Sequence, residues 1–395
     1  MRAVTRPLAE VCDGDPDLNG IAAGDGSLFV RDGVGFAARG VAARVPLADV
    51  PALLGAIAHD DRVGGVHPIA FGVVPFEPHL SCEVVIPSLL VGKAADGRRW
   101  VTTIDDTAPD IAVTPPPQPS AQAFTVTPRT PTDHYLAAVA TARDAVRSGS
   151  LTKAVIAREI DVRSEHPIDV HSVLLRLKAM FGRSYRYSMD GFIGASPELL
   201  VAVDGNRVRS HPLAGTTPRT GDPEADARAA AELLASEKNQ IEHRVVIDMI
   251  HDTLLPWCSY LDWEPEPSIV TVANVQHLGT AMEGHLSDPR PNVLELVRAL
   301  CPTPALGGFP RAEALRLIAE AEGFVRGRYG GAVGWVDAAG DGTWAVAIRC
   351  AELSADRRQA RLVAGGGIVA ESDPVAELAE TQAKFQAMLS AIVRP

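Results

Sequence analysis

The chain has 395 residues, 46% hydrophobic and 22% charged, which is typical of a folded globular protein and excludes a disordered chain. Its 37 lysines and arginines against 49 acidic residues give a net charge of −12, which disfavours binding to nucleic acid or anionic membranes. No apolar run approaches the roughly 18 residues that span a bilayer, and we expect no signal peptide. The five cysteines form no Cys-x-x-Cys pair, which argues against a zinc site and favours a reducing cytoplasm.

Residues 1–110 predict mainly strands, because short apolar runs such as 27–30 and 69–74 are separated by glycine-containing breaks. Residues 111–132 are rich in proline and contain the run Pro-Pro-Pro-Gln-Pro at 115–119. Proline fixes φ and donates no backbone hydrogen bond. We therefore interpret this segment as an extended linker or surface crossing.

Residues 133–395 have a different pattern, in which helices and strands alternate. An apolar stripe predicts a helix that begins near Thr132, and the run 154–162 predicts a strand. Two hairpins are expected. Asp-Gly-Asn separates strands at 192–203 and 207–210, and Gly-Asp-Gly separates strands at 332–337 and 344–353.

Capping residues mark the later helices. Asp222 precedes a proline and opens a helical region that reaches about residue 255, with a break near Ser236. Asp373 precedes another proline and caps a final helix, after a strand at 361–364. This order of hairpins and separate helices indicates an α+β fold and not a doubly wound βαβ chain.

The final helix carries the first candidate site residues. Glu377, Glu380 and Lys384 share one of its faces, an arrangement also found in ordinary solvated ion pairs. The run Gly365-Gly366-Gly367 lies just upstream, between a strand and this helix. Such a run is commonly a turn, but glycines there also let backbone amides approach an anion.

Four further charged residues lie within apolar surroundings. Glu242 shares its helix face with apolar residues, so its carboxylate needs a cation, a proton or a structural salt bridge. Arg349 lies in an apolar strand and must face a carboxylate of the protein or of a ligand. Lys153, at the start of a strand, is either a solvated edge residue or a desolvated base. Glu198 lies beside strand residues, where a carboxylic acid can stay protonated.

Together these groups suit a small polyanionic ligand bound with Mg²⁺, which proteins commonly hold by one or two carboxylates plus ligand oxygens. Neither a Cys/His ligand set nor a Walker-type phosphate loop competes with this interpretation.

Eight ordered motifs resemble the chorismate-utilising enzymes, strongly over residues 130–395 and loosely before them. They are Leu-Thr-Lys-Ala-Val at 151–155, Ser-Pro-Glu-Leu-Leu at 196–200, Pro-Leu-Ala-Gly-Thr at 212–216, Ile-Glu-His at 241–243, Cys-Pro-Thr-Pro-Ala-Leu-Gly-Gly at 301–308, Ala-Ile-Arg-Cys-Ala at 347–351, Gly-Gly-Gly-Ile at 365–368 and Glu-Thr-Gln-Ala-Lys at 380–384.

The chain is most similar to the isochorismate synthases of this family. Ammonia-using relatives usually carry Gln at the position of Lys153, and Lys there accompanies water as the nucleophile. The chain departs from the family in two places. Asn239-Gln240 stands where many relatives have Asp-Arg, and Gly366 stands where Ala is commoner.

The resemblance implies a single large domain, in which two antiparallel sheets pack face to face and helices lie outside. It also implies that residues 1–110 add strands to the core, that 111–132 connect, and that 133–395 form the chorismate-binding catalytic region.

The resemblance further implies a role for each candidate residue. Lys153 would activate water for attack at C2 of chorismate, and protonated Glu198 would deliver a proton to the departing C4 hydroxyl. Mg²⁺ would be held by Glu242 and Glu380, with Glu377 nearby. The implied substrate-binding residues are Gly215, Thr216, His277, Ala305, Leu306, Tyr329, Arg349, Gly365, Gly367 and Lys384.

The reaction expected is isomerisation of chorismate to isochorismate for siderophore or menaquinone biosynthesis. A salicylate synthase, which adds pyruvate elimination to the same first step, is the main alternative. An anthranilate-type synthase and a non-catalytic chorismate-binding relative are further alternatives. We expect a cytoplasmic monomer with no nucleic-acid or membrane partner.

Overall fold

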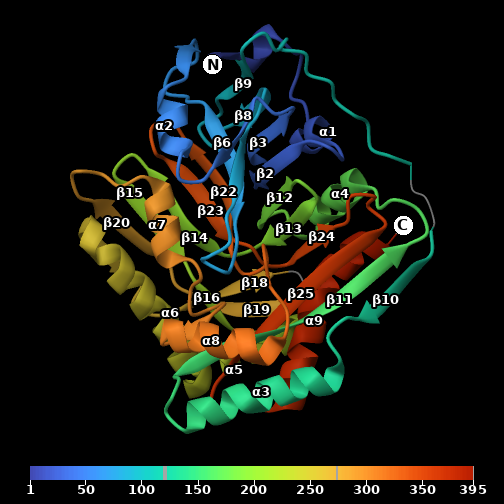
Figure 1. Ribbon diagram of the computed structural model, residues 1–395, viewed down its shortest axis with the longest axis vertical. Helices are drawn as coiled ribbons and strands as arrows, with labels where there is room; N and C mark the ends of the chain where they lie inside the picture. Colours follow the sequence, from blue (N-terminus) through green and yellow to red (C-terminus); the bar gives the residue numbers. More distant parts are fainter. Residues whose placement is uncertain (119–121, 273–274, 395) are drawn as a thin grey trace.

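The computed structural model describes residues 1–118, 122–272 and 275–394, so residues 119–121 of the expected linker lie outside the described residues. Within them, the strands form sheets of 13, nine and three strands. β1 and β5 pair in parallel, whereas the central pairs β11–β25 and β6–β22 are antiparallel. Figure 1 shows β11 and β25, which are distant in sequence, side by side.

The 13-stranded sheet contains the longest strands. In spatial order it is built from β10 (Phe124–Pro128), β11 (Lys153–Ser164), β25 (Gln359–Ile368), β24 (Cys350–Leu353), β13 (Phe192–Ser196), β12 (Tyr185–Met189), β2 (Ser27–Arg31), β3 (Val34–Arg39), β8 (Leu89–Lys93), β9 (Arg99–Ile104), β1 (Arg2–Pro7) and β5 (Ala58–Asp61), and β21 (Gly308–Phe309) pairs with β11.

The other two sheets are smaller. The nine-stranded sheet runs in the order β17 (Cys258–Trp263), β20 (Met282–Leu286), β15 (Arg207–His211), β14 (Leu199–Asp204), β23 (Gly342–Val346), β22 (Ala332–Asp337), β6 (Ile69–Val74), β7 (Glu83–Ile86) and β4 (Ala43–Pro46). The three-stranded sheet is β16 (Leu213–Pro218), β19 (Val275–Gly279) and β18 (Ser268–Val272).

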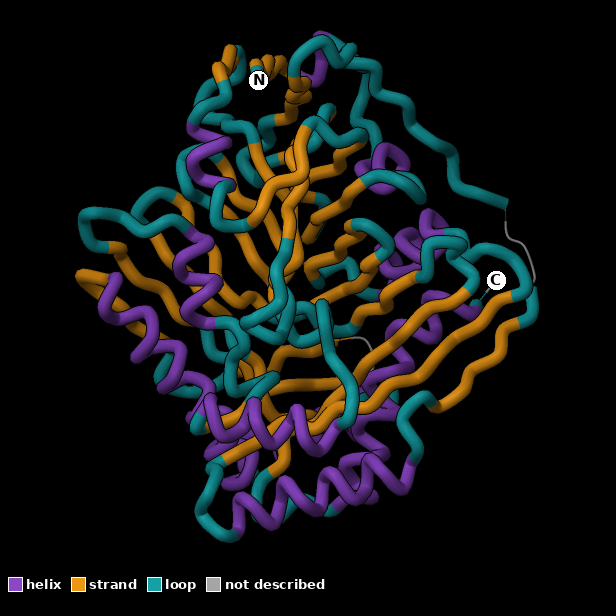
Figure 2. Tube along the Cα trace, in the orientation of Figure 1, coloured by secondary structure: helices purple, strands orange, loops and turns teal. Residues whose placement is uncertain are grey.

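Helices lie outside the strand-filled centre, as the purple segments of Figure 2 show. None of those in the described ranges is long and apolar enough to cross a membrane. They are α1 (Leu18–Ala22), α2 (Val50–Gly55), α3 (Thr132–Arg147), α4 (Val170–Met180), α5 (Pro223–Ala235), α6 (Glu237–Leu254), α7 (Val293–Leu300), α8 (Arg311–Glu322) and α9 (Pro374–Val393), with 3-10 turns at Leu8–Glu10 and Leu255–Trp257.

The helix boundaries follow the capping residues expected from the sequence. The side chains of Asp222 and Asp373 accept backbone hydrogen bonds at the starts of α5 and α9. Ser236 ends α5 in an extended conformation and caps α6, which confirms the expected break.

The two large sheets face each other across an apolar core. The ring of Phe36 on β3 lies edge to face with Phe71 on β6 and with Trp335 on β22, at centroid distances of 6.1 and 4.9 Å. This arrangement confirms the expected fold, although the sequence did not indicate the three-stranded sheet. Strands of residues 1–110 take part in both large sheets, because β2 pairs with β12 and β6 with β22.

Two apolar runs that we expected to be single strands are each divided between the two large sheets. The chain leaves the 13-stranded sheet after β13, passes Pro197 and Glu198, and enters the nine-stranded sheet as β14. It makes the opposite change between β23 and β24, where Arg349 has a φ of +51°. Backbone bonds from Ala195 to Arg349 and from Val346 to Glu198 hold the two crossings side by side.

Two further expectations were wrong. Gly365–Gly367 is not a turn, because it continues β25 in register with residues 155–157 of β11. The proline-rich segment is not only a connector, because β10 pairs with the end of β11. Proline is tolerated in an edge strand, where its missing N–H removes no inner ladder bond.

Candidate active site

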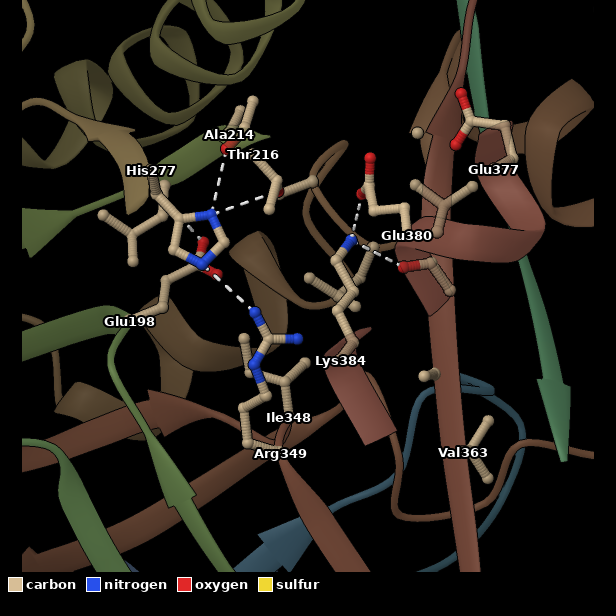
Figure 3. Close-up of a pocket in the computed structure, with 18 of the residues that line it drawn as sticks. Glu198, Ala214, Thr216, His277, Ile348, Arg349, Val363, Glu377, Glu380 and Lys384 are labelled. Atoms are coloured by element: carbon tan, nitrogen blue, oxygen red, sulfur yellow. Dashed lines mark hydrogen bonds and ion pairs between the residues drawn. The ribbon is translucent and has the colours of Figure 1, made fainter. Parts of the chain in front are cut away.

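The two sheet crossings form one wall of a pocket, and helices α6 and α9 contribute to another wall. Every site residue singled out from the sequence lines this pocket: Lys153, Glu198, Gly215, Thr216, Glu242, His277, Ala305, Leu306, Tyr329, Arg349, Gly365, Gly367, Glu377, Glu380 and Lys384. Figure 3 shows part of this lining, with Glu198, His277 and Arg349 on one side and Glu380 and Lys384 on the other.

Glu198 lies at the first sheet crossing and is only 3% exposed. Its Oε1 accepts a hydrogen bond from the backbone N–H of Leu213, at 3.4 Å. Burial raises the pKa of Glu198 to about 7, although the nearby positive charges of Lys153, Arg349 and Lys384 oppose this rise. The side chain can therefore be protonated near neutral pH, as a general acid requires.

Arg349 lies at the second crossing and is oriented by His277. Its Nη2 donates to His277 Nε2 at 3.1 Å, and His277 Nδ1 lies 2.9 Å from the carbonyl oxygen of Gly215 and 3.2 Å from Thr216 Oγ1. A guanidinium can only donate and a carbonyl can only accept, so the proton of the neutral imidazole is assigned to Nδ1. Burial, with Arg349 alongside, lowers the pKa of His277 to about 3, which keeps the ring neutral.

Lys153 is 1% exposed, so of the two alternatives left open by the sequence the solvated edge residue is wrong. It begins β11 with its side chain in the pocket, where Nζ lies 2.8 Å from Oε1 of Glu242 on α6. A buried ammonium group needs such an anion, and Glu242 supplies it. This pair joins the 13-stranded sheet to α6 across the pocket.

The face of α9 presents two carboxylates and a lysine. Lys384 Nζ lies 2.6 Å from Glu380 Oε1 and donates to the Gly365 carbonyl oxygen at 2.8 Å. Burial and the neighbouring charge of Glu380 raise the pKa of Glu377 to about 7. Ser372 donates to one oxygen of Glu377 at 2.9 Å, while Oε2 is buried with no hydrogen-bond partner.

Glycines in β25 make room for these carboxylates. A Cβ at Gly366 would lie 2.5 Å from Oε2 of Glu377, and one at Gly367 would overlap Oε1 of Glu242 and lie 2.8 Å from Cε of Lys153. An alanine at 366 would therefore require the Glu377 carboxylate to move, and one at 367 would require both Glu242 and Lys153 to move.

The carboxylates fit a hard divalent cation that shares its coordination with a ligand. Among the described residues, no group of three or more His, Cys, Asp or Glu side chains gathers as a complete metal site. One buried oxygen of Glu377 lacks a partner, however, and Glu242 and Glu380 line the same pocket. Mg²⁺ commonly takes one or two carboxylates and completes its shell with substrate oxygens and water.

Comparison with known proteins identifies the family. A family model described as chorismate binding enzyme matches residues 80–393. The chain belongs to the chorismate binding enzymes. Relatives of this family include a putative isochorismate synthase (MenF) of Mycobacterium tuberculosis, 41% identical over 83% of this chain and 87% of the relative. The isochorismate synthase DhbC of Bacillus subtilis is 37% identical over 90% of each chain.

Solved structures of chorismate binding enzymes share the fold. A putative 2,3-dihydroxybenzoate-specific isochorismate synthase from Bacillus anthracis is 34% identical, with a TM-score of 0.79 over 94% of this chain and 96% of that chain. The menaquinone-specific isochorismate synthase from Escherichia coli gives a TM-score of 0.84 over 100% of this chain and 94% of that chain. Its 23% identity supports the fold alone.

The pocket of this chorismate binding enzyme also contains residues that were not among the predicted site residues, although some of them lie within the quoted motifs. Lys238 precedes Glu242 by one helical turn, and its Nζ lies 3.9 Å from Glu377 Oε1. The i, i+4 spacing of Lys238 and Glu242 could have predicted from the sequence that both side chains lie on the same helix face. Asn239, one of the departures from the family pattern, also lines the pocket. The remaining additions are mainly apolar: Val155, Leu213, Ala214, Ile348, Cys350, Leu362, Val363, Ala364, Phe385 and Met388.

Proposed function

We propose that this protein is an isochorismate synthase, which converts chorismate to isochorismate. Water adds a hydroxyl at C2 of the ring, the ring double bonds shift, and the C4 hydroxyl leaves as water. The observation that carries this proposal is a lysine and a protonatable glutamate, both buried, that line one pocket in a chain 37–41% identical to isochorismate synthases.

Lys153 is the proposed base and Glu198 the proposed acid. The pKa of Glu198, raised by burial to about 7, suits delivery of a proton to the departing C4 oxygen. Lys153 must take a proton from water, so it has to be neutral at that moment. In the structure Glu242 pairs with the Lys153 side chain. If Glu242 binds the metal in the substrate complex, Lys153 loses this anionic partner.

The remaining polar residues bind and orient the two carboxylates of chorismate. Arg349 can direct its remaining guanidinium donors to the enolpyruvyl carboxylate while His277 holds Nη2. Tyr329, Lys384 and the Gly365–Gly367 backbone support the same group. Gly215 and Thr216, fixed through His277, shape the ring end together with Ala305 and Leu306.

Mg²⁺ is the proposed cofactor, and Glu242 and Glu380 are its proposed ligands, with Glu377 beside them. When held by these residues, Mg²⁺ would supply Lewis-acid activation of the substrate, which favours attack on the ring. The chain's own contribution would be to present the carboxylates of Glu242, Glu377 and Glu380 on the lining of one pocket.

The proposed product feeds siderophore or menaquinone biosynthesis, since the relatives include a vibriobactin-specific isochorismate synthase and enzymes named MenF. We further propose a cytoplasmic monomer without nucleic-acid or membrane partners. The acidic net charge of −12 supports the absence of both polyanionic partners.

One incubation tests the proposed function. Purified protein, chorismate and Mg²⁺ are expected to give isochorismate by chromatography, with no product when a chelator removes the metal. Fluorescent salicylate as the main product would instead support the salicylate synthase alternative, and a requirement for ammonium would support an anthranilate-type enzyme. Mg²⁺-linked binding of chorismate without turnover would contradict any catalytic assignment.

A further inference from the structure

One edge of β11 has a gap between two partner strands. β21 pairs with Lys153 and Ala154, and β10 pairs with residues 160–164. Residues 155–159 lie between these pairings, while the opposite edge of β11 pairs with β25 continuously over residues 154–163. Buried backbone groups in the gap need other partners.

Side chains of α8 and of the loop after it bond to backbone groups in the middle of the gap, whereas the Gly307 carbonyl and residues 129 and 130 serve its two ends. Glu322 Oε1 accepts the backbone N–H of Ala157 at 2.7 Å, and Arg326 Nη2 donates to the carbonyl oxygen of Val155 at 2.7 Å. The two side chains pair with each other at 2.5 and 2.9 Å, and both are 0% exposed. Glu322 and Arg326, called here the edge pair, thus bond two backbone groups of β11 that a neighbouring strand would otherwise pair.

The edge pair does not itself line the pocket, but it contacts three segments that do. Arg326 Nη1 donates to the carbonyl oxygen of Leu306 at 2.7 Å, and its guanidinium carbon lies 5.9 Å from the ring centroid of Tyr329. The third segment is β11, where the bonded Val155 lies two residues from Lys153. The base, the apolar loop and the tyrosine therefore depend on one buried guanidinium.

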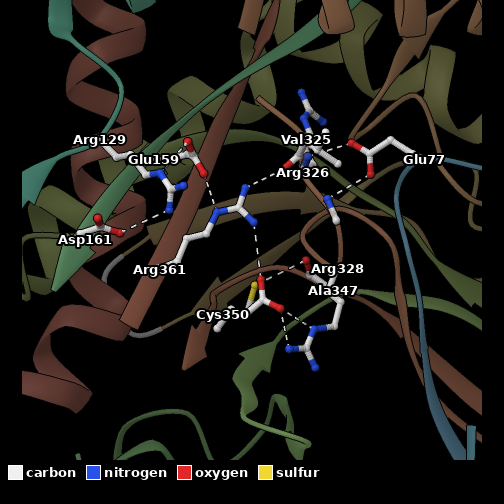
Figure 4. Close-up of polar contacts among 12 residues, drawn as sticks. Glu77, Arg129, Glu159, Asp161, Val325, Arg326, Arg328, Ala347, Cys350 and Arg361 are labelled. Carbon is white, nitrogen blue, oxygen red and sulfur yellow. Dashed lines mark hydrogen bonds and ion pairs between the residues drawn. The ribbon is translucent and has the colours of Figure 1, made fainter. Parts of the chain in front are cut away.

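The backbone of Arg326 is itself fixed. Glu77 accepts the amide N–H groups of Arg326 and Gly327 at 2.8 and 3.0 Å, as Figure 4 shows. Arg361, drawn in the same figure, bonds to Glu159 and to the Val325 carbonyl oxygen. Arg361 thus contacts the same two segments as the edge pair but donates to neither Val155 nor Leu306, which makes it a matched control for loss of a nearby charged contact.

We propose that the edge pair is a positioning device for the reaction, which sets Lys153 against the substrate held by Leu306 and Tyr329. This inference rests on the proposed function. A lysine at 326 keeps the charge but cannot donate in a planar fork to Glu322, Val155 and Leu306 at once. A misplacement of the base by about 1 Å can slow a reaction by roughly 100-fold.

The test compares R326K and E322Q with the control R361K, all folded by circular dichroism and corrected for the folded fraction. R326K is expected to lower kcat about 100-fold and E322Q about 10-fold, with KM for chorismate changed less than about 3-fold. The solvent deuterium isotope effect on kcat is expected to rise, because proton transfer to Lys153 becomes slower. A smaller folded fraction alone leaves that isotope effect unchanged.

Hydrogen exchange gives a readout that needs no activity. Exchange at the Ala157 amide is expected to be about 10-fold faster in both edge-pair variants and unchanged in R361K. If R326K does not fold, E322Q alone decides. The proposed positioning role would be overturned if folded R326K and E322Q kept the parent kcat, the parent isotope effect and the parent exchange rate at the Ala157 amide. An inactive parent protein whose variants still show faster exchange would contradict the proposed function but keep the edge pair as the support of β11.

Discussion

The sheet wall and the helix wall of the pocket are built differently. On the sheet wall, Arg349, His277 and the Gly215 carbonyl form a continuous hydrogen-bond chain, which Figure 3 shows as dashed lines. On the helix wall, Glu242 and Glu380 are each held by a lysine, and one oxygen of Glu377 has no partner.

This difference suggests that the sheet wall is ready to bind substrate, whereas the side chains of the helix wall must rearrange. The sheet wall comes from the two backbone crossings and from β16 and β19, all locked by strand pairing, so its donors already have fixed directions. The helix wall carries carboxylates whose ion-pair partners are nearby lysine ammonium groups, and a cation bound with substrate would compete with these groups. The predictions below test that contrast.

Replacing Lys153 by alanine is expected to have the largest effect. Loss of a general base typically costs 10²–10⁴-fold, and we expect kcat to fall about 1,000-fold or more. Product chromatography measures the rate, and chorismate affinity by calorimetry is the control for binding. A near-normal rate in a folded variant would show that Lys153 is not the base.

Removing a carboxylate from the helix wall is expected to weaken Mg²⁺ binding. E380Q should raise the Mg²⁺ concentration needed for half-maximal activity by about 100-fold, and E377Q by about 10-fold, because Glu380 is the proposed ligand and Glu377 lies beside it. Metal titrations at saturating chorismate measure both. Equal effects would place Glu377 in direct contact with the metal, and no effect in E380Q would contradict the metal assignment.

On the sheet wall, R349K is expected to weaken substrate binding without disturbing the metal. A charge-assisted hydrogen bond contributes about 1.5–3 kcal/mol, so KM for chorismate is expected to rise roughly 10- to 100-fold while the Mg²⁺ requirement stays unchanged. H277N gives a matched control, since it leaves the guanidinium in place but removes its orienting partner. A parent-like KM in R349K would exclude Arg349 from carboxylate binding.

The smallest effect concerns pH. Since the pKa of Glu198 is raised to about 7, kcat is expected to fall about tenfold per unit as pH rises above that value. Between the ordinary value of 4.5 and about 7 the folded state holds a proton that the unfolded state has lost, so the contribution of Glu198 to stability is also lost as pH rises through this window. Profiles of kcat against pH measure the effect on activity, and denaturant titrations at several pH values measure the effect on stability. A falling limb retained unchanged in E198Q would assign it to another group.

The sequence predicted the local parts of this structure well. Both hairpin turns, the caps at Asp222 and Asp373 and the break at Ser236 depend on neighbouring residues, and each is confirmed. The site residues came from the charge pattern and the family resemblance, and the structure gathers all of them in one pocket.

Features that depend on distant segments were missed. An apolar run looks the same whether it stays in one sheet or changes sheets, so the crossings at Glu198 and Arg349 were not expected. Lys153 is buried because Glu242, 89 positions away along the chain, reaches it. Glu322 and Arg326 have the spacing of an ordinary surface ion pair, and only the gap in β11 shows their role.

The pairing of β6 with β22 has a consequence for biosynthesis. Residues 69–74 leave the ribosome long before residues 332–337, at a synthesis rate of about 5–20 residues per second. For a time on the order of tens of seconds, one edge of this apolar strand therefore lacks its final partner, although β7 becomes available to the other edge soon after β6 is made. The nine-stranded sheet can close only after most of the polypeptide has been made, and until then this strand depends on chaperones or temporary contacts to avoid aggregation.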